Sequence, residues 1–171
     1  MIDQHTALVV IDLQHGVVGL PGVPNSTADV IARAVDLADA FRAAGAPVVL
    51  VRVTGPGTDR PAGWDELVPE LGEHPDDVRV TKHTWGAFHA TDLDLQLRRR
   101  GVTDIVLTGV ATSIGVESTA RAAYEHGYRV TVVADAVTDL DQDAHRNSIE
   151  WIFPRLGEVT TVDALLSRTP A

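Results

Sequence analysis

Six short apolar runs are spaced along the chain, and segments with helical periodicity lie between them. The run Ala7–Ile11 is apolar throughout, which is typical of a strand buried on both faces of a parallel sheet. After it, Val30, Ala34, Leu37 and Phe41 recur at helical spacing and predict one apolar helix face. The predicted strands, in chain order, are Ala7–Ile11, Pro47–Val53, Val78–Thr81, Asp104–Leu107, Arg129–Ala134 and Glu158–Val162.

Turn and capping residues predict where the first helix begins and ends. The stretch Gly16–Pro24 is rich in glycine and proline and reads as a loop. Either Ser26 or Thr27 then caps the helix, since both carry a side-chain oxygen that can accept a backbone N–H. Gly45 ends the helix before the second strand begins.

The later helices have similar signals at their ends. Thr91 is the predicted cap of the helix before the fourth strand, and Gly101 ends it. Either Asp139 or Asp141 starts the helix after the fifth strand, and we expect Pro154 to stop it. This alternation predicts an α/β fold: a single-domain, doubly wound, six-stranded parallel sheet with helices on both faces, over residues 1–171.

The composition narrows the class of partner. A formal net charge of −10 argues against nucleic acid and against an anionic membrane as the main partner. The 171 residues contain no cysteine, which removes disulfides, thiolate metal ligands and thiol catalysis together. The polar segment Met1–His5 does not look like a signal peptide, so we expect a cytoplasmic protein that acts on a small molecule.

A long connection, Thr54–Asp77, separates the second and third predicted strands. Loops of this length at strand ends are usually lids or binding loops. It contains Asp59 and Arg60, and we interpret both as solvated charges because loops carry charge by default.

Three features follow the carboxyl ends of predicted strands. Asp12 follows the first strand, Lys82 follows the third, and a small-residue turn, Thr108–Ser113, follows the fourth and leads to a helix with Gly115 in its first turn. Such ends share one rim, where α/β proteins bind ligands. The turn is either a plain connection or a site for a negatively charged oxygen. The pair Asp12 and Lys82 is either a simple ion pair or an acid–base couple.

Three ordered motifs resemble those of the isochorismatase-like (cysteine hydrolase) family. They are Val9–Gln14 (VVIDLQ), Thr81–Phe88 (TKHTWGAF) and Thr108–Arg121 (TGVATSIGVESTAR), and Val133–Ala136 (VADA) is also familiar. The resemblance covers nearly the whole chain. It implies a hydrolase with an Asp–Lys–Cys triad at Asp12, Lys82 and position 115, where this chain has Gly115 in place of the nucleophilic cysteine.

The resemblance also implies the surroundings of the site. It implies a cis peptide bond at Val110–Ala111 and an oxyanion hole formed by the N–H groups of Ala111 and Gly115. The substrate-binding residues that it indicates are Trp85, Phe88, Val110, Ala111 and Ile114. Trp85 has a second interpretation, as a core aromatic residue that packs on the sheet.

With glycine at position 115, this chain resembles true isochorismatases, which cleave a vinyl ether without a covalent intermediate. By that analogy Asp12 is the acid, Lys82 binds a substrate carboxylate and orients Asp12, and Gly115 leaves room for the substrate. This chain departs from those enzymes after the second strand, where Gly55 and Pro56 replace their Gln-Pro pair. This departure argues against isochorismate itself as the substrate and leaves a related small anionic or ether substrate open.

Metal-binding relatives carry an Asp-x-His motif after the second strand, where this chain has Asp59–Pro61 (DRP). We therefore expect no metal and no cofactor, and the resemblance implies a homo-oligomer. Two alternatives remain open. One is a binding protein that kept the pocket and lost the chemistry, and the other is an amidase with a different nucleophile, of which Ser113 is near but has no evident base.

Overall fold

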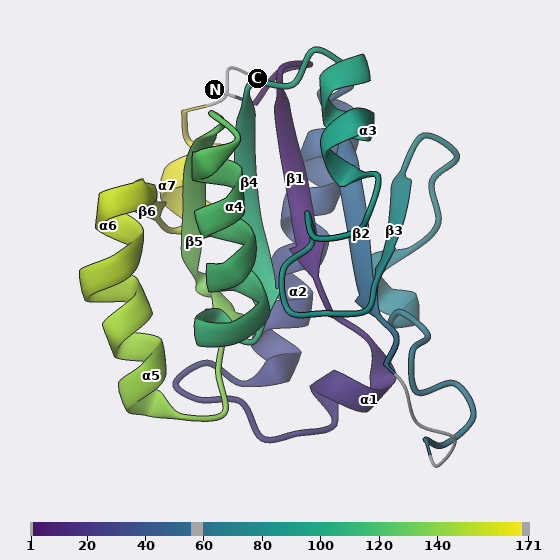
Figure 1. The fold of residues 1–171 in the computed structure, drawn as a ribbon, viewed down its shortest axis with the longest axis vertical. Coiled ribbons are helices and arrows are strands. Elements are labelled where there is room, and N and C mark those ends of the chain that lie inside the picture. The colour runs from purple at the N-terminus through teal and green to yellow at the C-terminus, as the bar shows by residue number, and fades with distance from the viewer. Residues whose placement is uncertain (1, 56–59, 169–171) are drawn as a thin grey trace.

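In the computed structural model, which describes residues 2–55 and 60–168, all six strands form one parallel sheet (Figure 1). The strand order is β3-β2-β1-β4-β5-β6, so the predicted doubly wound fold is confirmed. The strands are β1 (Thr6–Ile11), β2 (Val48–Val53), β3 (Val78–Lys82), β4 (Asp104–Val110), β5 (Arg129–Thr138) and β6 (Gly157–Thr160).

Helices cover both faces of the sheet, as Figure 1 shows. One layer contains α3 (Leu93–Arg99), α4 (Glu117–Glu125), α5 (Gln142–Asn147) and α6 (Phe153–Leu156), and the other contains α2 (Thr27–Ala43) and α7 (Val162–Leu166). Because side chains alternate along a strand, Ala7, Val9 and Ile11 of β1 join the core on one face, and Leu8 and Val10 join the core on the other.

The apolar face predicted for α2 is confirmed. Val30, Ala34, Leu37 and Phe41 are fully buried against the sheet. Each large side chain of this face contributes about 1.5–3 kcal/mol by leaving water. Ser26 is the N-cap, and its hydroxyl accepts the Asp29 N–H.

Two predicted strand ends are wrong because β4 and β5 pair beyond an irregularity. β4 continues to Val110 and β5 to Thr138, and their register shifts between Leu107 and Gly109. The shift adds the pairs Gly109–Val137 and Val110–Thr138, so half of the turn predicted after Leu107 is strand. The alternation of apolar residues does not reveal such a bulge.

Two local predictions on helices also need correction. The stretch predicted as a loop before α2 contains a short helix, α1 (His15–Val18). Pro154 does not stop the helix before it, because helical backbone runs on through the π-helical turn Ser148–Ile152 into α6. Pro154 is the second residue of α6, which follows directly on the π-helical turn.

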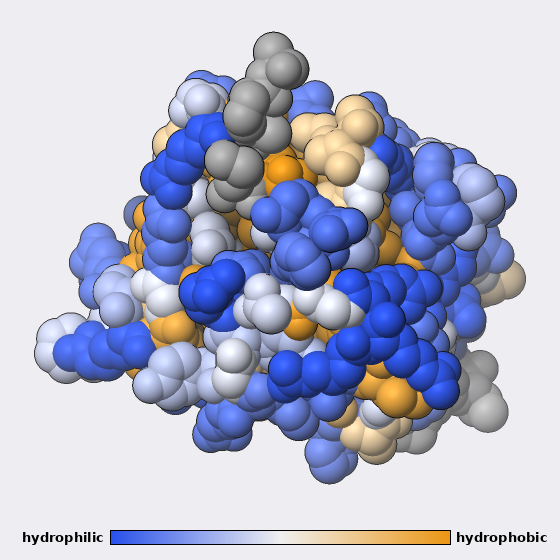
Figure 2. Space-filling view, turned by 90° about the horizontal axis from the view of Figure 1, so that it is seen from above, coloured by the Kyte–Doolittle hydropathy of each residue, from blue (hydrophilic) through white to orange (hydrophobic). Residues whose placement is uncertain are grey.

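The remaining connections include a 3-10 turn, Pro69–Leu71, and a π-helical turn, Thr112–Val116, that precedes α4. The end of the molecule seen in Figure 2 is the one where β1 begins, and hydrophilic side chains predominate there. The candidate site lies at the other end of the sheet, beyond the carboxyl ends of the strands.

Candidate active site

The strand order reverses between β1 and β4, and a pocket of about 340 Å³ opens beyond their carboxyl ends. Ligands of open α/β sheets bind at such reversal points. The pocket brings together the predicted residues Asp12, Lys82, Trp85, Val110, Ala111, Ile114 and Gly115. Side chains from three strand ends therefore meet there, as the sequence predicted.

Gly109 allows β4 to approach β1 closely at this point. Its Cα pairs with Ile11, the last residue of β1, and its φ is +119°, which L side chains rarely adopt. A Cβ at position 109 would overlap the carbonyl oxygen of Ile11. The absence of a side chain therefore keeps Asp12 and the turn after β4 next to each other.

Asp12 has an unusual conformation and a buried carboxylate. Its φ is +53°, in the left-handed region that aspartate tolerates better than most residues. Its Oδ2 accepts a hydrogen bond from Lys82 Nζ at 2.7 Å. Its Oδ1 is buried and has no hydrogen-bond partner within the described ranges.

Burial dominates the protonation equilibrium of Asp12. Removal from water raises the pKa of this carboxyl to about 6, although the charge and the hydrogen bond of Lys82 act to lower it. At pH 7 roughly a tenth of the molecules then hold the proton, against about 0.1% for an ordinary aspartate. The buried pair can therefore hold a proton near neutral pH.

Lys82 is buried because it occupies the inward face of β3. Along Val78–Lys82 the buried and exposed residues alternate, with Val78 and Val80 on the same face as Lys82. Only 1% of the Lys82 side chain is exposed. Its Nζ donates to Asp12 Oδ2 and to the carbonyl oxygen of Thr84, at 3.1 Å.

The turn after β4 places Gly115 against the carboxylate. The Val110–Ala111 peptide bond is cis. The Ala111 carbonyl oxygen accepts the N–H groups of Ile114 and Val116, both at 3.1 Å. A Cβ at position 115 would lie 3.1 Å from Ile11 Cγ2 and 3.3 Å from Asp12 Oδ2.

Thr119 ties this turn to the segment that carries Lys82. Its hydroxyl donates to the Gly115 carbonyl oxygen at 2.6 Å and accepts the Ala87 N–H at 3.1 Å. Ala87 belongs to the connection between β3 and α3. The two segments are therefore joined by one buried hydroxyl.

A second set of polar groups forms hydrogen bonds with the turn after β4. The sequence analysis did not identify this set as part of the site. Asp139 Oδ2 accepts the Ser113 N–H at 2.6 Å, and Thr112 Oγ1 lies 2.9 Å from His145 Nδ1. Burial lowers the pKa of His145, and the charge of Asp139 opposes that effect. Asp139 follows the observed end of β5 at Thr138 and not the predicted end at Ala134, so the sequence did not mark it as a strand-end residue.

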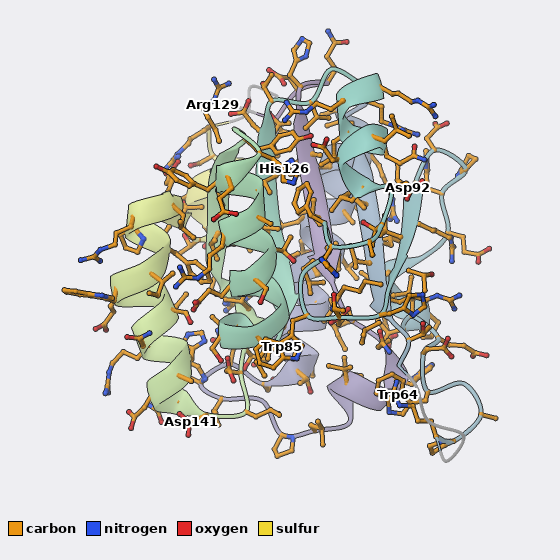
Figure 3. All side chains as sticks on the ribbon, viewed as in Figure 1. Trp64, Trp85, Asp92, His126, Arg129 and Asp141 are labelled. Atoms are coloured by element: carbon orange, nitrogen blue, oxygen red, sulfur yellow. The ribbon has the colours of Figure 1, made fainter. Side chains whose placement is uncertain are left out.

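Two of the predicted aromatic residues have different environments. Trp85 is 67% exposed at the pocket, which contradicts its alternative interpretation as a core residue, and Figure 3 shows it at the same end of the sheet as Trp64. Phe88, predicted to bind substrate, is not among the residues that line the pocket. Its ring stacks on His126, with 5.1 Å between centroids, and packs beside Tyr128.

The pocket also has wall residues that the sequence analysis did not place there. These are Val17 and Leu20 near α1, Val53, Gly55 and Arg60 at the end of β2 and in its loop, His83 and Thr84 after β3, and Leu140 after β5. Arg60 is exposed, as expected, but it also lines the pocket, whereas Asp59 lies outside the described residues. Apolar residues inside a glycine-rich loop were the available signal for Val17 and Leu20.

Within the residues that the structure describes, no three histidine or acidic side chains are grouped so that they could hold a metal ion. In the same part of the chain no helix is long and apolar enough to cross a membrane.

Comparison with known proteins bears on the family of this chain. The sequence model of the isochorismatase domain matches residues 6–164. The chain is 43% identical to the uncharacterized isochorismatase family protein YecD of Escherichia coli O157:H7, over 95% of each chain. It is 34% identical to the ureidoacrylate amidohydrolase RutB of Pseudomonas syringae, over 92% of this chain and 81% of the relative. An isochorismatase family protein structure from Burkholderia thailandensis matches with a TM-score of 0.90 and 49% identity, over 98% of this chain and 96% of that one. The chain therefore belongs to the isochorismatase family.

Proposed function

We propose that this protein is a hydrolase that acts on a small anionic molecule without a covalent intermediate. The reaction that we assign is vinyl-ether hydrolysis, with Asp12 as the general acid. One observation carries the proposal: a buried carboxyl with a pKa of about 6 lies next to Gly115, where no nucleophilic side chain stands. General acids work best when their pKa is close to the working pH.

The proposed reaction begins with proton transfer from Asp12 to the terminal methylene carbon of the vinyl ether. The π electrons form the new C–H bond, and the ether oxygen stabilises the oxocarbenium ion that results. Water then adds to the cationic carbon and returns a proton to Asp12. The hemiketal then collapses: the bond from its carbon to the former ether oxygen breaks, the hydroxyl proton is transferred to that leaving oxygen, and the products are a ketone and an alcohol.

Lys82 has a positioning role in this scheme. It holds Asp12 Oδ2 at 2.7 Å, and we therefore assign proton delivery to Oδ1, which has no partner among the described residues. Lys82 also stabilises the carboxylate that forms when the proton leaves. Gly115 leaves room for the substrate, and the N–H groups of Ala111 and Gly115 are the donors that we assign to the leaving oxygen as the hemiketal C–O bond breaks.

The test is turnover by the wild type and by Asp12→Asn on a panel of enol ethers that includes isochorismate, with product ketone measured by coupled assay. We expect the wild type to release product from at least one compound and Asp12→Asn to be slower by about 10²-fold or more. If the two proteins do not differ on any compound, the catalytic role of Asp12 is wrong.

The absent cysteine supports a second candidate, a binding protein that kept the pocket and lost turnover. It predicts ligand stabilisation of about 2.7 kcal/mol at a hundred times Kd, with no product by mass spectrometry. Any product formed at an enzymatic rate would eliminate it.

The similarity to an amidohydrolase supports a third candidate, an amidase with another nucleophile. Ser113 is not among the pocket-lining residues, and its N–H is bound to Asp139, which disfavours that serine. An acyl adduct on the intact protein would support this candidate. By the same family resemblance we propose that the protein forms a homo-oligomer, which light scattering on the eluted protein would measure.

A further inference from the structure

A second positive charge lies at the pocket, apart from Lys82. The Arg60 guanidinium carbon lies 3.7 Å from the ring centroid of Trp64, and Arg60 lines the same pocket as Asp12. Stacking on an indole holds a guanidinium plane in place and leaves the N–H groups on its edge available. Arg60 is therefore held as a flat donor at the pocket wall.

The indole under Arg60 is itself fixed to α1, beside which Figure 3 shows Trp64. A Cβ at position 16 would overlap the Trp64 ring, so the ring lies directly against the Gly16 backbone. The Gly16 N–H donates to the Trp64 carbonyl oxygen at 2.9 Å, and the His15 N–H donates to that of Glu66 at 3.0 Å. The loop that carries Arg60 is thus docked on α1 by ring packing and by backbone hydrogen bonds.

The charges around the pocket do not balance. Lys82 is paired with Asp12 and is almost fully buried, so its charge is already compensated. No carboxylate forms an ion pair with Arg60 within residues 2–55 and 60–168. Among the described Asp, Lys and Arg side chains that line the pocket, Arg60 is therefore the one without an ion-pair partner, in a chain of formal net charge −10.

Most of the remaining wall is apolar, and His83 and Thr84 add polar groups to it. Leu20, Trp85 and Leu140 stand exposed around the pocket, at 47%, 67% and 50%, and come from three separate connections. Val17, Val53, Val110, Ala111 and Ile114 also belong to this apolar lining. A volume of about 340 Å³ fits a small ring-sized molecule.

We propose that Arg60, and not Lys82, binds the carboxylate of the substrate, and that the substrate is a monocarboxylate with an apolar body. This inference rests on the proposed function in so far as it names the substrate of that site. The two edge N–H groups of a guanidinium match the two oxygens of a carboxylate, which favours carboxylate over a neutral group of the same shape. A molecule bound in this way spans from Arg60 toward the Asp12 carboxyl along the apolar wall.

Binding of benzoate and of benzamide tests the proposal, since the two probes have nearly the same shape and differ in charge. We expect the wild type to bind benzoate more tightly, as measured by calorimetry or by ligand-observed NMR. In Arg60→Gln the Kd of benzoate should rise about tenfold or more, which is the loss of one charge-assisted contact. The Kd of benzamide should change less than about twofold.

Arg155→Gln is the matched control, because the guanidinium carbon of Arg155 also lies over an indole, 3.8 Å from the Trp151 centroid, and Arg155 does not line the pocket. This variant should leave both Kd values unchanged. Arg60→Lys keeps the charge without the planar fork and should give an intermediate benzoate Kd.

Equal benzoate affinity in the wild type and Arg60→Gln, or no preference for benzoate over benzamide in the wild type, would overturn the assignment of Arg60. Absence of benzoate binding to the wild type up to the millimolar range would also count against it. The two proposals fail separately, because the binding test needs no turnover. Benzoate selectivity in a protein that turns over no substrate would contradict the proposed function alone.

Discussion

The Asp12 carboxylate is held by one oxygen only: Lys82 Nζ lies 2.7 Å from Oδ2, and Oδ1 has no hydrogen-bond partner within the described ranges. A buried carboxylate with one unpaired oxygen is costly when charged. This carboxylate lies at the point where the strand order reverses and the pocket opens. Groups with shifted pKa values are concentrated at functional sites, because catalytic acids and bases need pKa values that match their task.

The raised pKa of Asp12 predicts how stability depends on pH. The carboxyl titrates near 3.8 when unfolded and near 6 when folded, so the folded protein holds this proton more tightly. Its contribution to stability is fully present below pH 3.8 and is lost as pH rises through 6, a difference of about 3 kcal/mol. The free energy of unfolding of Asp12→Asn, relative to the wild type, should therefore increase by about 2.4 kcal/mol between pH 4 and pH 7.

Urea unfolding of both proteins at half-unit pH steps measures this difference. Asp36→Asn, at an exposed position of α2, is the control and should not reproduce the pH-dependent difference. A difference between Asp12→Asn and the wild type that stays constant across this range would contradict a raised pKa.

Restoration of a thiol tests the geometry around Gly115. A Cβ there would lie 3.1 Å from Ile11 Cγ2, 3.3 Å from Asp12 Oδ2 and 3.5 Å from the Trp85 carbonyl oxygen, so neighbours need to move by only a few tenths of an ångström. In Gly115→Cys we expect the thiol to have a pKa below the ordinary 8.5, because the start of a helix favours thiolate.

Alkylation by iodoacetamide as a function of pH measures this pKa without interference, since the chain has no other cysteine. Ala32→Cys, on the exposed face of α2, is the matched control and should titrate as a free thiol. The same titration midpoint for both introduced thiols would show that the turn does not stabilise an anion at position 115.

The sequence was sufficient to predict the elements on which the fold depends. Continuous apolar runs such as Ala7–Ile11 predict strands that are covered on both sides, and the alternation of strands with helices predicts a parallel sheet. Parallel strands have their carboxyl ends at one edge, which brings Asp12, Lys82 and Gly115 together without any knowledge of strand order.

The errors arise where the outcome depends on contacts between distant segments. The extra residues of β4 and β5 come from a register shift between the two strands, and the helix passes Pro154 because a π-helical turn precedes it. The position of Arg60 at the pocket depends on Trp64, which in turn depends on the space left by Gly16. No local pattern contains that information.

The contact between Gly16 and Trp64 predicts an effect at a distance. Any side chain at position 16 would overlap the indole, so Gly16→Ala should displace Trp64 and with it the Arg60 guanidinium. We expect a changed tryptophan emission spectrum and, if Arg60 binds carboxylates, a loss of benzoate selectivity of about tenfold. Circular dichroism should report an unchanged sheet, because the ring lies outside the two core clusters.

Gly19→Ala is the matched control in the same connection. Gly19 has a φ of −70°, and an added Cβ would meet only the His15 carbonyl oxygen, at 3.4 Å. This variant should leave emission and selectivity unchanged. Equal behaviour of the two variants would show that the contact between Gly16 and Trp64 does not position Arg60.

One alanine has a backbone conformation that favours glycine. Ala90 is exposed and has a φ of +53°, where its Cβ crowds the backbone. Ala90→Gly removes that crowding, although glycine loses more conformational entropy on folding. We expect a net gain of about 0.5 kcal/mol or more in the free energy of unfolding. Ala32→Gly is the same substitution at an exposed site inside α2, and there it should cost about 1 kcal/mol. Chemical denaturation of the two variants against the wild type measures both values, and a loss of stability in Ala90→Gly would contradict strain at Ala90.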